Sequence, residues 1–289
     1  MPERTELLAV DGWAVHAPGW AAADLPGSPA EPACPPEQAK EVLGRKGLLG
    51  KEPATRLAMC AVHRALGLPP GRPTEPLPGA AGTAVIVASN LGNAETVCTV
   101  LSDMRERSGS VVSPLDAPNV SSNVIASTLA IWYGFTGPNL TVCSGATAGL
   151  DALRLARVLL LSGRARKAVV VGVEPADPIA VKLAALRPDS PGELTAAAGC
   201  VLLGAPSAWP EPTGLRCGPV LRHREPVEAA GSVPGELYGA AGVVQLAAAA
   251  ARMAEAGPGT ASVTVSCGDT EDGWASLEIV HATPAGAVA

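Results

Sequence analysis

Three side chains that could act as nucleophiles lie close together, at Cys143, Ser144 and Thr147. They belong to a stretch from Gly137 to Asp151 that predicts a β-strand, a tight turn of small residues and the first turn of a helix. Backbone N–H groups at such a helix start can converge on an oxyanion or a thiolate. The same small residues would also let a helix pack closely on a strand, so the spacing alone leaves both interpretations open.

A nucleophile of this kind needs a positioned base, and histidine is the usual one. The four histidines are His16, His63, His223 and His281. None belongs to a cluster of Asp, Glu or Cys, so we expect each on the surface or in a loop and predict no metal site. The glycine-rich stretch 44–51 lacks the spacing of a phosphate loop and no strand precedes it, so no nucleotide cofactor is expected.

The flanking sequence predicts strands and helices that alternate along the chain. Apolar runs predict strands over 6–16, 83–89, 140–143, 167–173, 199–203 and near 215–222, and alternating runs over 262–267 and 274–280 predict a closing hairpin. Helical spacing predicts helices over 53–66, 94–106, 120–132, 147–162 and 238–253. The strand, helix and strand within 140–173 predict a right-handed βαβ crossover. The fold class is therefore α/β.

Composition excludes several kinds of partner. The 289 residues are 47% apolar, enough for one large domain or two smaller ones. The net charge of −6 and the absence of a long basic run argue against binding of nucleic acid or of an anionic membrane. Seven cysteines without a CxxC pair predict reduced thiols, with Cys60 and Cys200 buried. The polar start and the short apolar helices predict a cytoplasmic protein.

Several segments together resemble the ketosynthases of the thiolase superfamily. They lie at 10–15, 83–92, 113–119, 133–138, 148–153, 169–174 and 235–242, and the closing hairpin fits the end of that fold. The resemblance covers nearly the whole chain. It implies a thiolase-like fold of α/β/α/β/α layers, with a complete first half at 1–205 and a truncated second half at 206–289.

The chain differs from the ketosynthase pattern at the positions where the resemblance implies catalytic residues. Counted from Gly137, the position of the acyl-accepting Cys is occupied by Ala146, and Glu236 stands where the late His is expected. The other His, in a His-Gly-Thr-Gly-Thr stretch, is absent. Condensation needs a thiolate to hold the acyl chain and His donors to stabilise the oxyanion. We therefore predict no catalytic residues for condensation, and no catalysis by this chain alone.

Three interpretations follow from these departures. In the first, the chain resembles a chain-length factor, a non-catalytic subunit that pairs with an active ketosynthase in type II polyketide or fatty-acid-like biosynthesis. The resemblance implies that it pairs as a heterodimer or with itself through the edge near Asn139–Gly145, and helps shape the acyl pocket or stabilise the complex. The second is an acyltransferase with a relocated nucleophile, and the third is a nonfunctional remnant.

The acyltransferase interpretation names its own residues. Cys143, Ser144 or Thr147 would be the nucleophile, and Glu236 would be the base available by analogy. The substrates would be acyl-carrier or CoA thioesters. No bound cofactor is implied, apart from phosphopantetheine-linked acyl chains on an acyl carrier protein, which is an acidic partner that a small basic patch could still meet.

Overall fold

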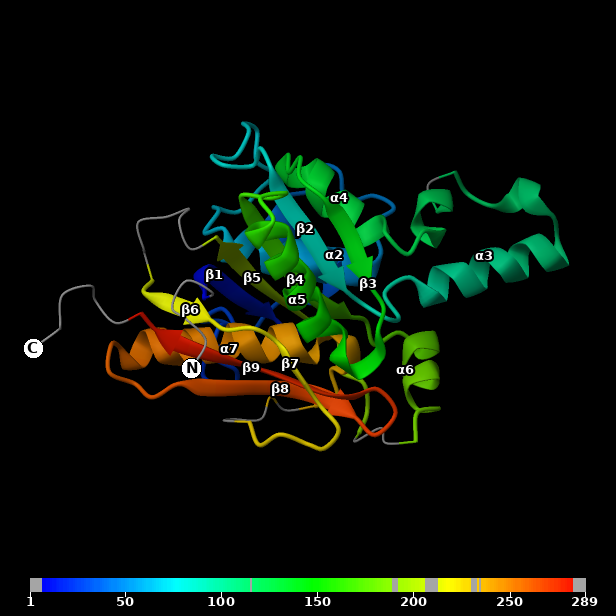
Figure 1. Cartoon of the computed structure of the whole chain (residues 1–289). Helices are drawn as coiled ribbons and strands as arrows, with labels where there is room; N and C mark the ends of the chain where they lie inside the picture. Colours follow the sequence, from blue (N-terminus) through cyan, green and yellow to red (C-terminus); the bar gives the residue numbers. More distant parts are fainter. Residues whose placement is uncertain are drawn as a thin grey trace, which may run out of the picture.

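A mixed β-sheet runs through the molecule and curls around a pair of helices (Figure 1). The computed structural model describes residues 7–114, 116–188, 192–205, 213–229, 233 and 235–282. Leu115, in one of the resembling segments, lies outside these residues, as does part of the expected boundary between the two halves. Among the described residues, the strands follow the order β3-β2-β4-β5-β1-β6-β9-β7, and β8 pairs with β9. Their bounds are β1 (Leu8–His16), β2 (Thr83–Ala88), β3 (Asn139–Val142), β4 (Lys167–Glu174), β5 (Ala197–Gly204), β6 (Leu215–Cys217), β7 (Leu221–His223), β8 (Val263–Asp269) and β9 (Gly273–His281).

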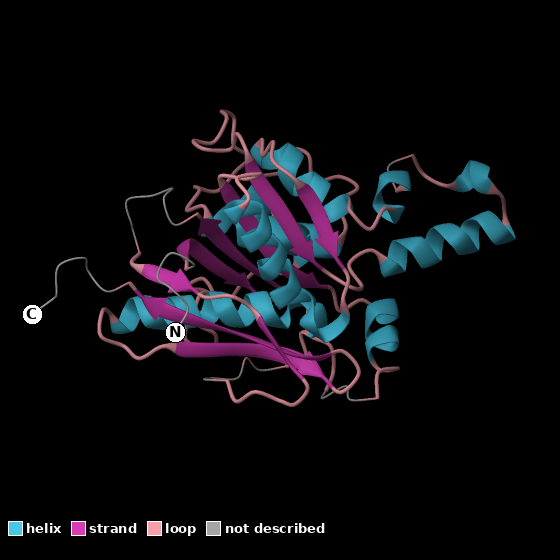
Figure 2. Ribbon diagram, in the orientation of Figure 1, coloured by secondary structure: helices cyan, strands magenta, loops and turns pink. Residues whose placement is uncertain are grey.

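Helices cover the sheet in layers (Figure 2). They are α1 (Lys40–Leu43), α2 (Pro53–Ala65), α3 (Ala94–Glu106), α4 (Val124–Tyr133), α5 (Ala148–Leu161), α6 (Pro178–Ala184) and α7 (Ala241–Ala256). Helices α2 and α4 pack on one face of the strands β1–β5, through a core that includes Leu57 and Leu129. Helices α5 and α7 pack on the other face, and the β8–β9 hairpin covers them from below in the view. The prediction of a thiolase-like layered α/β fold is confirmed.

Small residues allow the two central helices to touch. A Cβ added to Gly149 of α5 would lie 2.9 Å from the backbone nitrogens of Gly242 and Val243 at the start of α7. Real Cβ atoms do not approach backbone nitrogen so closely, so this crossing requires glycine. Leu150 and Leu246 are fully buried around it. The alanines and glycines of the sequence thus allow α5 and α7 to pack closely together between two layers of strands.

The part of the chain predicted as the second half ends on a polar face. In the β8–β9 hairpin, Val265 and Leu277 face each other and are buried against α7, while the neighbouring pair Thr264 and Glu278 faces the other way. The alternation of period two puts the apolar side chains inward and the polar ones outward. Among the described residues no helix covers this outer face, so the layers observed are α/β/α/β and the last helix layer of the expected α/β/α/β/α arrangement is not seen there.

Several predictions of local structure need correction. Strands β3 and β4 are parallel as predicted, but both pair with β2, which lies between them. The strand expected near 215–222 is two short strands, β6 and β7, separated at Gly218. The prediction that the histidines lie on the surface or in loops is wrong for His16 and His63, which are 1% exposed. In the part of the chain described, no helix is both long and apolar enough to cross a membrane.

Candidate functional site

The turn between β3 and α5 is fixed from two sides. Gly145 has a φ of +68°, in the left-handed region that favours glycine. The Asn90 side chain binds both backbone groups of Gly145. Its Nδ2 donates to the Gly145 carbonyl at 3.0 Å, and its Oδ1 accepts from the Gly145 N–H at 3.1 Å. On the other side, a Cβ at residue 145 would collide with the carboxylate of Asp272. The turn therefore presents the next residue, Ala146, in one fixed position.

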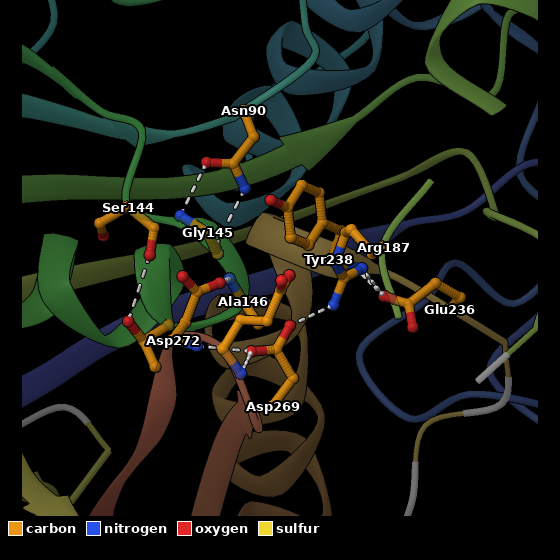
Figure 3. A network of polar contacts seen from close by, with 11 residues as sticks. Asn90, Ser144, Gly145, Ala146, Arg187, Glu236, Tyr238, Asp269 and Asp272 are labelled. Carbon is orange, nitrogen blue, oxygen red and sulfur yellow. Dashed lines mark hydrogen bonds and ion pairs between the residues drawn. The ribbon is translucent and has the colours of Figure 1, made fainter. Parts of the chain in front are cut away.

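Ala146 and Glu236 line the same cavity, which has a volume of about 410 Å³ (Figure 3). Arg187, Tyr238 and Asp269 also line it. The structure thus brings together the two positions that the resemblance assigns to the acyl-accepting Cys and to the late His. Ala146 offers a methyl group there, which can neither attack a carbonyl nor accept an acyl chain.

The backbone N–H of Ala146 already has a partner. It donates a 2.8 Å hydrogen bond to Oδ2 of Asp272, which lies in the turn between β8 and β9. That turn is held in shape by Asp269, whose Oδ1 accepts from the N–H groups of Asp272 at 2.7 Å and Glu271 at 3.1 Å. An N–H in this position would be a donor to an oxyanion if it were free. The Asp272 carboxylate thus accepts the hydrogen bond that an oxyanion would need from this N–H.

An ion-paired cluster forms the opposite wall of the cavity (Figure 3). Arg187 bonds Asp269 at 2.6 Å (Nη2 to Oδ2), and its Nη1 lies 3.5 Å from Oε1 of Glu236. The guanidinium also stacks over the ring of Tyr238, 3.8 Å from its centroid. Burial alone would raise the pKa of Asp269, but the hydrogen bonds from Arg187 and from the backbone of Asp272 and Glu271, with the charge of Arg187, together outweigh it and hold this pKa below its usual value. Oε1 of Glu236 also accepts a 2.5 Å hydrogen bond from the backbone N–H of Tyr238, so this carboxylate is held by Arg187 and by the turn that follows it.

Cys143 is poorly placed to act as a nucleophile. It follows β3, is exposed, and is not among the residues that line the cavity. Its Sγ donates to the carbonyl of Ser89 at 3.0 Å. Partial burial, together with the nearby carboxylate of Glu174, raises the pKa of the Cys143 thiol. The thiol is therefore mostly protonated near neutral pH, whereas the thiolate is the reactive form.

The side chains of Ser144 and Thr147 point toward the carboxylate of Asp151, which is not the predicted base Glu236. Ser144 Oγ donates to Asp151 Oδ2 at 2.7 Å, and Thr147 Oγ1 lies 3.0 Å from the same oxygen. Arg222 binds both oxygens of Asp151 at 2.6 Å and also donates to Thr147. Neither hydroxyl lines the cavity. The structure therefore groups these two candidates with each other, and separates them from Glu236.

A buried carboxylate that the sequence analysis did not single out as a site residue lies beneath the site. Glu174, the last residue of β4, is fully buried and accepts from the N–H groups of Asn90 at 2.7 Å and Leu91 at 3.0 Å. Burial raises its pKa to about 7, although these hydrogen bonds oppose the shift. A charged residue at the end of the apolar run 168–173 is the only sequence feature that could have marked it. Its contacts fix the loop that carries Asn90.

The predicted pairing edge is an edge in the structure. Among the described residues β3 pairs on one side only, with β2, and so ends the sheet. Beside it, an arm projects from the body, made of α3 and the 3-10 turns η3 (Gly109–Val111) and η4 (Ala117–Val120) (Figure 1). Helix α3 has no buried residue. The exposed apolar residues of the arm are Leu101, Met104, Val111 and Val120.

The family comparison covers the part of the chain that contains the turn. Residues 47–189, about half of the chain, match the family described as beta-ketoacyl synthase, N-terminal domain. A stretch of 97 residues is 32% identical to the 3-oxoacyl-[acyl-carrier-protein] synthase 2 of Vibrio cholerae and 30% identical to that of Vibrio harveyi. Each match covers 34% of this chain and only 23% of the relative's length.

Solved structures are similar over a longer range. The ishigamide ketosynthase/chain length factor aligns with a TM-score of 0.74 at 19% identity, covering 96% of this chain and 100% of that chain. A ketosynthase (ApeO) in complex with its chain length factor (ApeC), from Xenorhabdus doucetiae, aligns with a TM-score of 0.60 at 18% identity over 95% of this chain and 99% of that chain. At such identities the likeness establishes the fold, and it extends over nearly the whole chain.

Proposed function

Because the chain is a ketosynthase-like member of the thiolase superfamily, we propose that it is a non-catalytic subunit that pairs with an active ketosynthase. The pair would act in type II polyketide or fatty-acid-like biosynthesis, where this subunit would help shape the acyl pocket or stabilise the complex. An acyl carrier protein that presents phosphopantetheine-linked chains would then be a further partner of the pair.

The observation that carries the proposal is the occupied N–H of Ala146. Covalent condensation needs a nucleophile and a free oxyanion donor at one place. Here the nucleophile position is a methyl group, and the N–H beside it bonds Asp272 at 2.8 Å. Two independent elements, the turn before α5 and the β8–β9 hairpin, thus both oppose the chemistry. A single lost side chain would be weaker support.

The open edge of β3 supports pairing. An unpaired edge strand exposes a row of backbone donors and acceptors that a partner strand can complete. Leu140, in the middle of β3, is 36% exposed, and the adjacent arm adds Leu101 at 60% and Met104 at 52%. Exposed apolar side chains grouped around an open strand are typical of a protein interface. We expect a chain of the same fold to present the matching strand.

Co-expression with the ketosynthase encoded nearest to this chain tests the pairing. We expect the two chains to elute together in size-exclusion chromatography. Leu140→Arg should separate them, because it puts a charge into the joined edge. Leu221→Arg is the matched control, since Leu221 is 55% exposed on β7, at the far end of the sheet. Separate elution of the unmodified chains would overturn the proposed pairing.

A restored nucleophile tests the proposed loss of catalysis. In Ala146→Cys the new thiol would still lack an oxyanion donor, so we expect very slow transfer from an acyl-CoA thioester, followed by intact mass spectrometry. Removal of the carboxylate in Ala146→Cys/Asp272→Gly should raise the rate by about 10²- to 10³-fold, the usual value of one such donor. Ala146→Cys/Glu271→Gly is the control in the same turn. Equal rates in all three variants would contradict the role given to Asp272.

The acyltransferase remains the second candidate, favoured by one contact. The 2.7 Å hydrogen bond from Ser144 to Asp151 places a hydroxyl beside a carboxylate that could accept its proton. Nη2 of Arg222 also binds both oxygens of that carboxylate, so Ser144 shares Asp151 with an arginine. Incubation with acyl-carrier and acyl-CoA thioesters, followed by peptide mapping, decides this: an adduct on Cys143, Ser144 or Thr147 would favour transfer over assembly.

A further inference from the structure

One face of helix α5 is exposed beside the open edge of β3 (Figure 1). Arg154, Val158 and Leu161 are spaced by four and three residues, so their side chains share this face. Val158 is 57% exposed and Leu161 is 49% exposed, and Arg154 is exposed as well. We call these three residues the α5 stripe. A helix that packs on a sheet usually turns its apolar side chains inward, so two exposed aliphatic side chains indicate a face that another chain covers.

The α5 stripe continues the surface of β3. Asn139 and Thr141 hydrogen-bond toward α4, on the other face of the sheet. Successive side chains of a strand alternate, so Leu140 lies on the α5 face, as does Val142, which packs against the core around α5. Leu140 remains 36% exposed there. A chain that pairs with β3 would therefore also lie against the α5 stripe.

The α5 stripe carries a positive charge that nothing in the described part of the chain neutralises. Arg154 forms no hydrogen bond or ion pair with the residues that the structure describes. Asp151, the acidic residue one turn earlier, already binds Arg222 through both oxygens. Residues 139–167 contain five basic residues and one acidic residue, whereas the whole chain has a net charge of −6. The segment that forms β3 and α5 is thus basic within an acidic protein.

Two identical chains joined at β3 would place these charges against each other. Closed dimers use the same patch on both chains, so antiparallel β3 strands would be related by a two-fold axis perpendicular to the sheet. Such an axis keeps α5 and its copy side by side on one face of the joined sheet. A strand rises about 3.3 Å per residue and a helix about 1.5 Å, so the middle of β3 lies alongside the second turn of α5. Arg154 would then face Arg154 of the second copy near the axis, and like charges in an interface weaken binding.

We propose that Arg154 selects the partner of this chain: it prevents the pairing of two copies and favours a ketosynthase whose matching helix carries an acidic side chain. This inference rests on the proposed function and deepens it, because it names the residue that sets partner choice. A charge that repels one partner and attracts another gives specificity in both directions. Val158 and Leu161 would add apolar contacts beside the ion pair.

Light scattering during size-exclusion chromatography tests the effect on self-pairing. The unmodified chain alone should elute as a monomer. In Arg154→Leu the repulsion is gone, so we expect a dimer, which the additional change Leu140→Arg should return to monomers. Arg154→Lys keeps the charge and should stay monomeric. An unmodified chain that dimerises and becomes monomeric in Leu140→Arg would overturn the inference, as would an Arg154→Leu chain that stays monomeric.

Binding of the ketosynthase encoded nearest to this chain, measured by isothermal titration calorimetry, tests the effect on partner choice. Arg154→Glu should weaken binding by at least about tenfold, whereas Arg154→Lys should retain it. Replacement of the acidic residue on the ketosynthase's matching helix by Arg should restore the binding of Arg154→Glu. Lys40→Glu, exposed on α1, is the matched charge control and should bind like the unmodified chain. Equally tight binding by Arg154→Glu would overturn the inference, even if that variant lost affinity for an acyl carrier protein.

The two measurements separate this inference from the proposed function. If the unmodified chain binds no ketosynthase, the proposed function fails. The light scattering then decides alone, because a dimer formed by Arg154→Leu would still uphold the effect of Arg154 on self-pairing, and a monomer would overturn it.

Discussion

Glu174 gives the most quantitative prediction, because its carboxylate is completely buried beneath the loop of Asn90. Burial raises its pKa from 4.5 to about 7, against the opposing hydrogen bonds from Asn90, Leu91 and Ser89. The folded chain therefore keeps a proton that the unfolded chain loses above pH 4.5, so the free energy of unfolding falls as the pH rises. Each unit of pKa difference is worth about 1.4 kcal/mol, so the fall from this group reaches about 3 kcal/mol once the pH exceeds the folded pKa.

Urea unfolding followed by circular dichroism, at about pH 5 and about pH 8, measures this effect. Glu174→Gln cannot ionise, so the stability of the unmodified chain relative to this variant should fall by about 2 to 3 kcal/mol over that range, because a small part of the full effect is already lost at pH 5. Any constant loss caused by the amide cancels in this comparison. Glu278→Gln, exposed on β9, is the matched control and should keep the pH dependence of the unmodified chain. The same pH dependence in the unmodified chain and in Glu174→Gln would refute the reasoning.

Three further predictions concern stability and use the same unfolding assay. Leu246→Ala in α7 should cost about 3 kcal/mol because it opens a cavity in the core, whereas Leu101→Ala, exposed on α3, should stay within about 0.5 kcal/mol of the unmodified chain. Gly149→Ala should cost about 1–3 kcal/mol, since its Cβ would overlap the backbone of α7. Arg187→Met should cost about 3 kcal/mol by leaving Asp269 buried without its partner, and a loss below 1 kcal/mol would contradict the ion pair.

Local patterns predicted the elements well. Helix α3 begins and ends at the predicted residues 94 and 106, and the closing hairpin pairs as the alternation of its strands indicates. These features depend on periodicity within one segment, which a sequence displays directly. The order of strands was harder, because nothing in residues 140–173 indicates that β2 lies between β3 and β4.

The candidate site was predictable only in part. The resemblance located Ala146 and Glu236, and both line the cavity. It gave no indication of Asp272, which is 126 residues from Ala146 in sequence and reaches it only because the β8–β9 turn folds back over α5. Arg187 was missed for the same reason, as its role depends on Asp269 and Tyr238 from later elements. Such long-range polar contacts leave no periodic trace in the sequence.

The position of β1 in the sheet has a consequence for biosynthesis. Ala9 of β1 pairs with Gly204 of β5, and Leu8 pairs with Cys217 of β6. Strand β1 therefore has no native strand partner until about 200 more residues have been made, which takes roughly 10 to 40 s. During that interval its apolar side chains have no sheet to enter, and contacts of such long range are slow to form. We expect the nascent chain to depend on chaperones, or on a partner chain synthesised nearby, until β5 arrives.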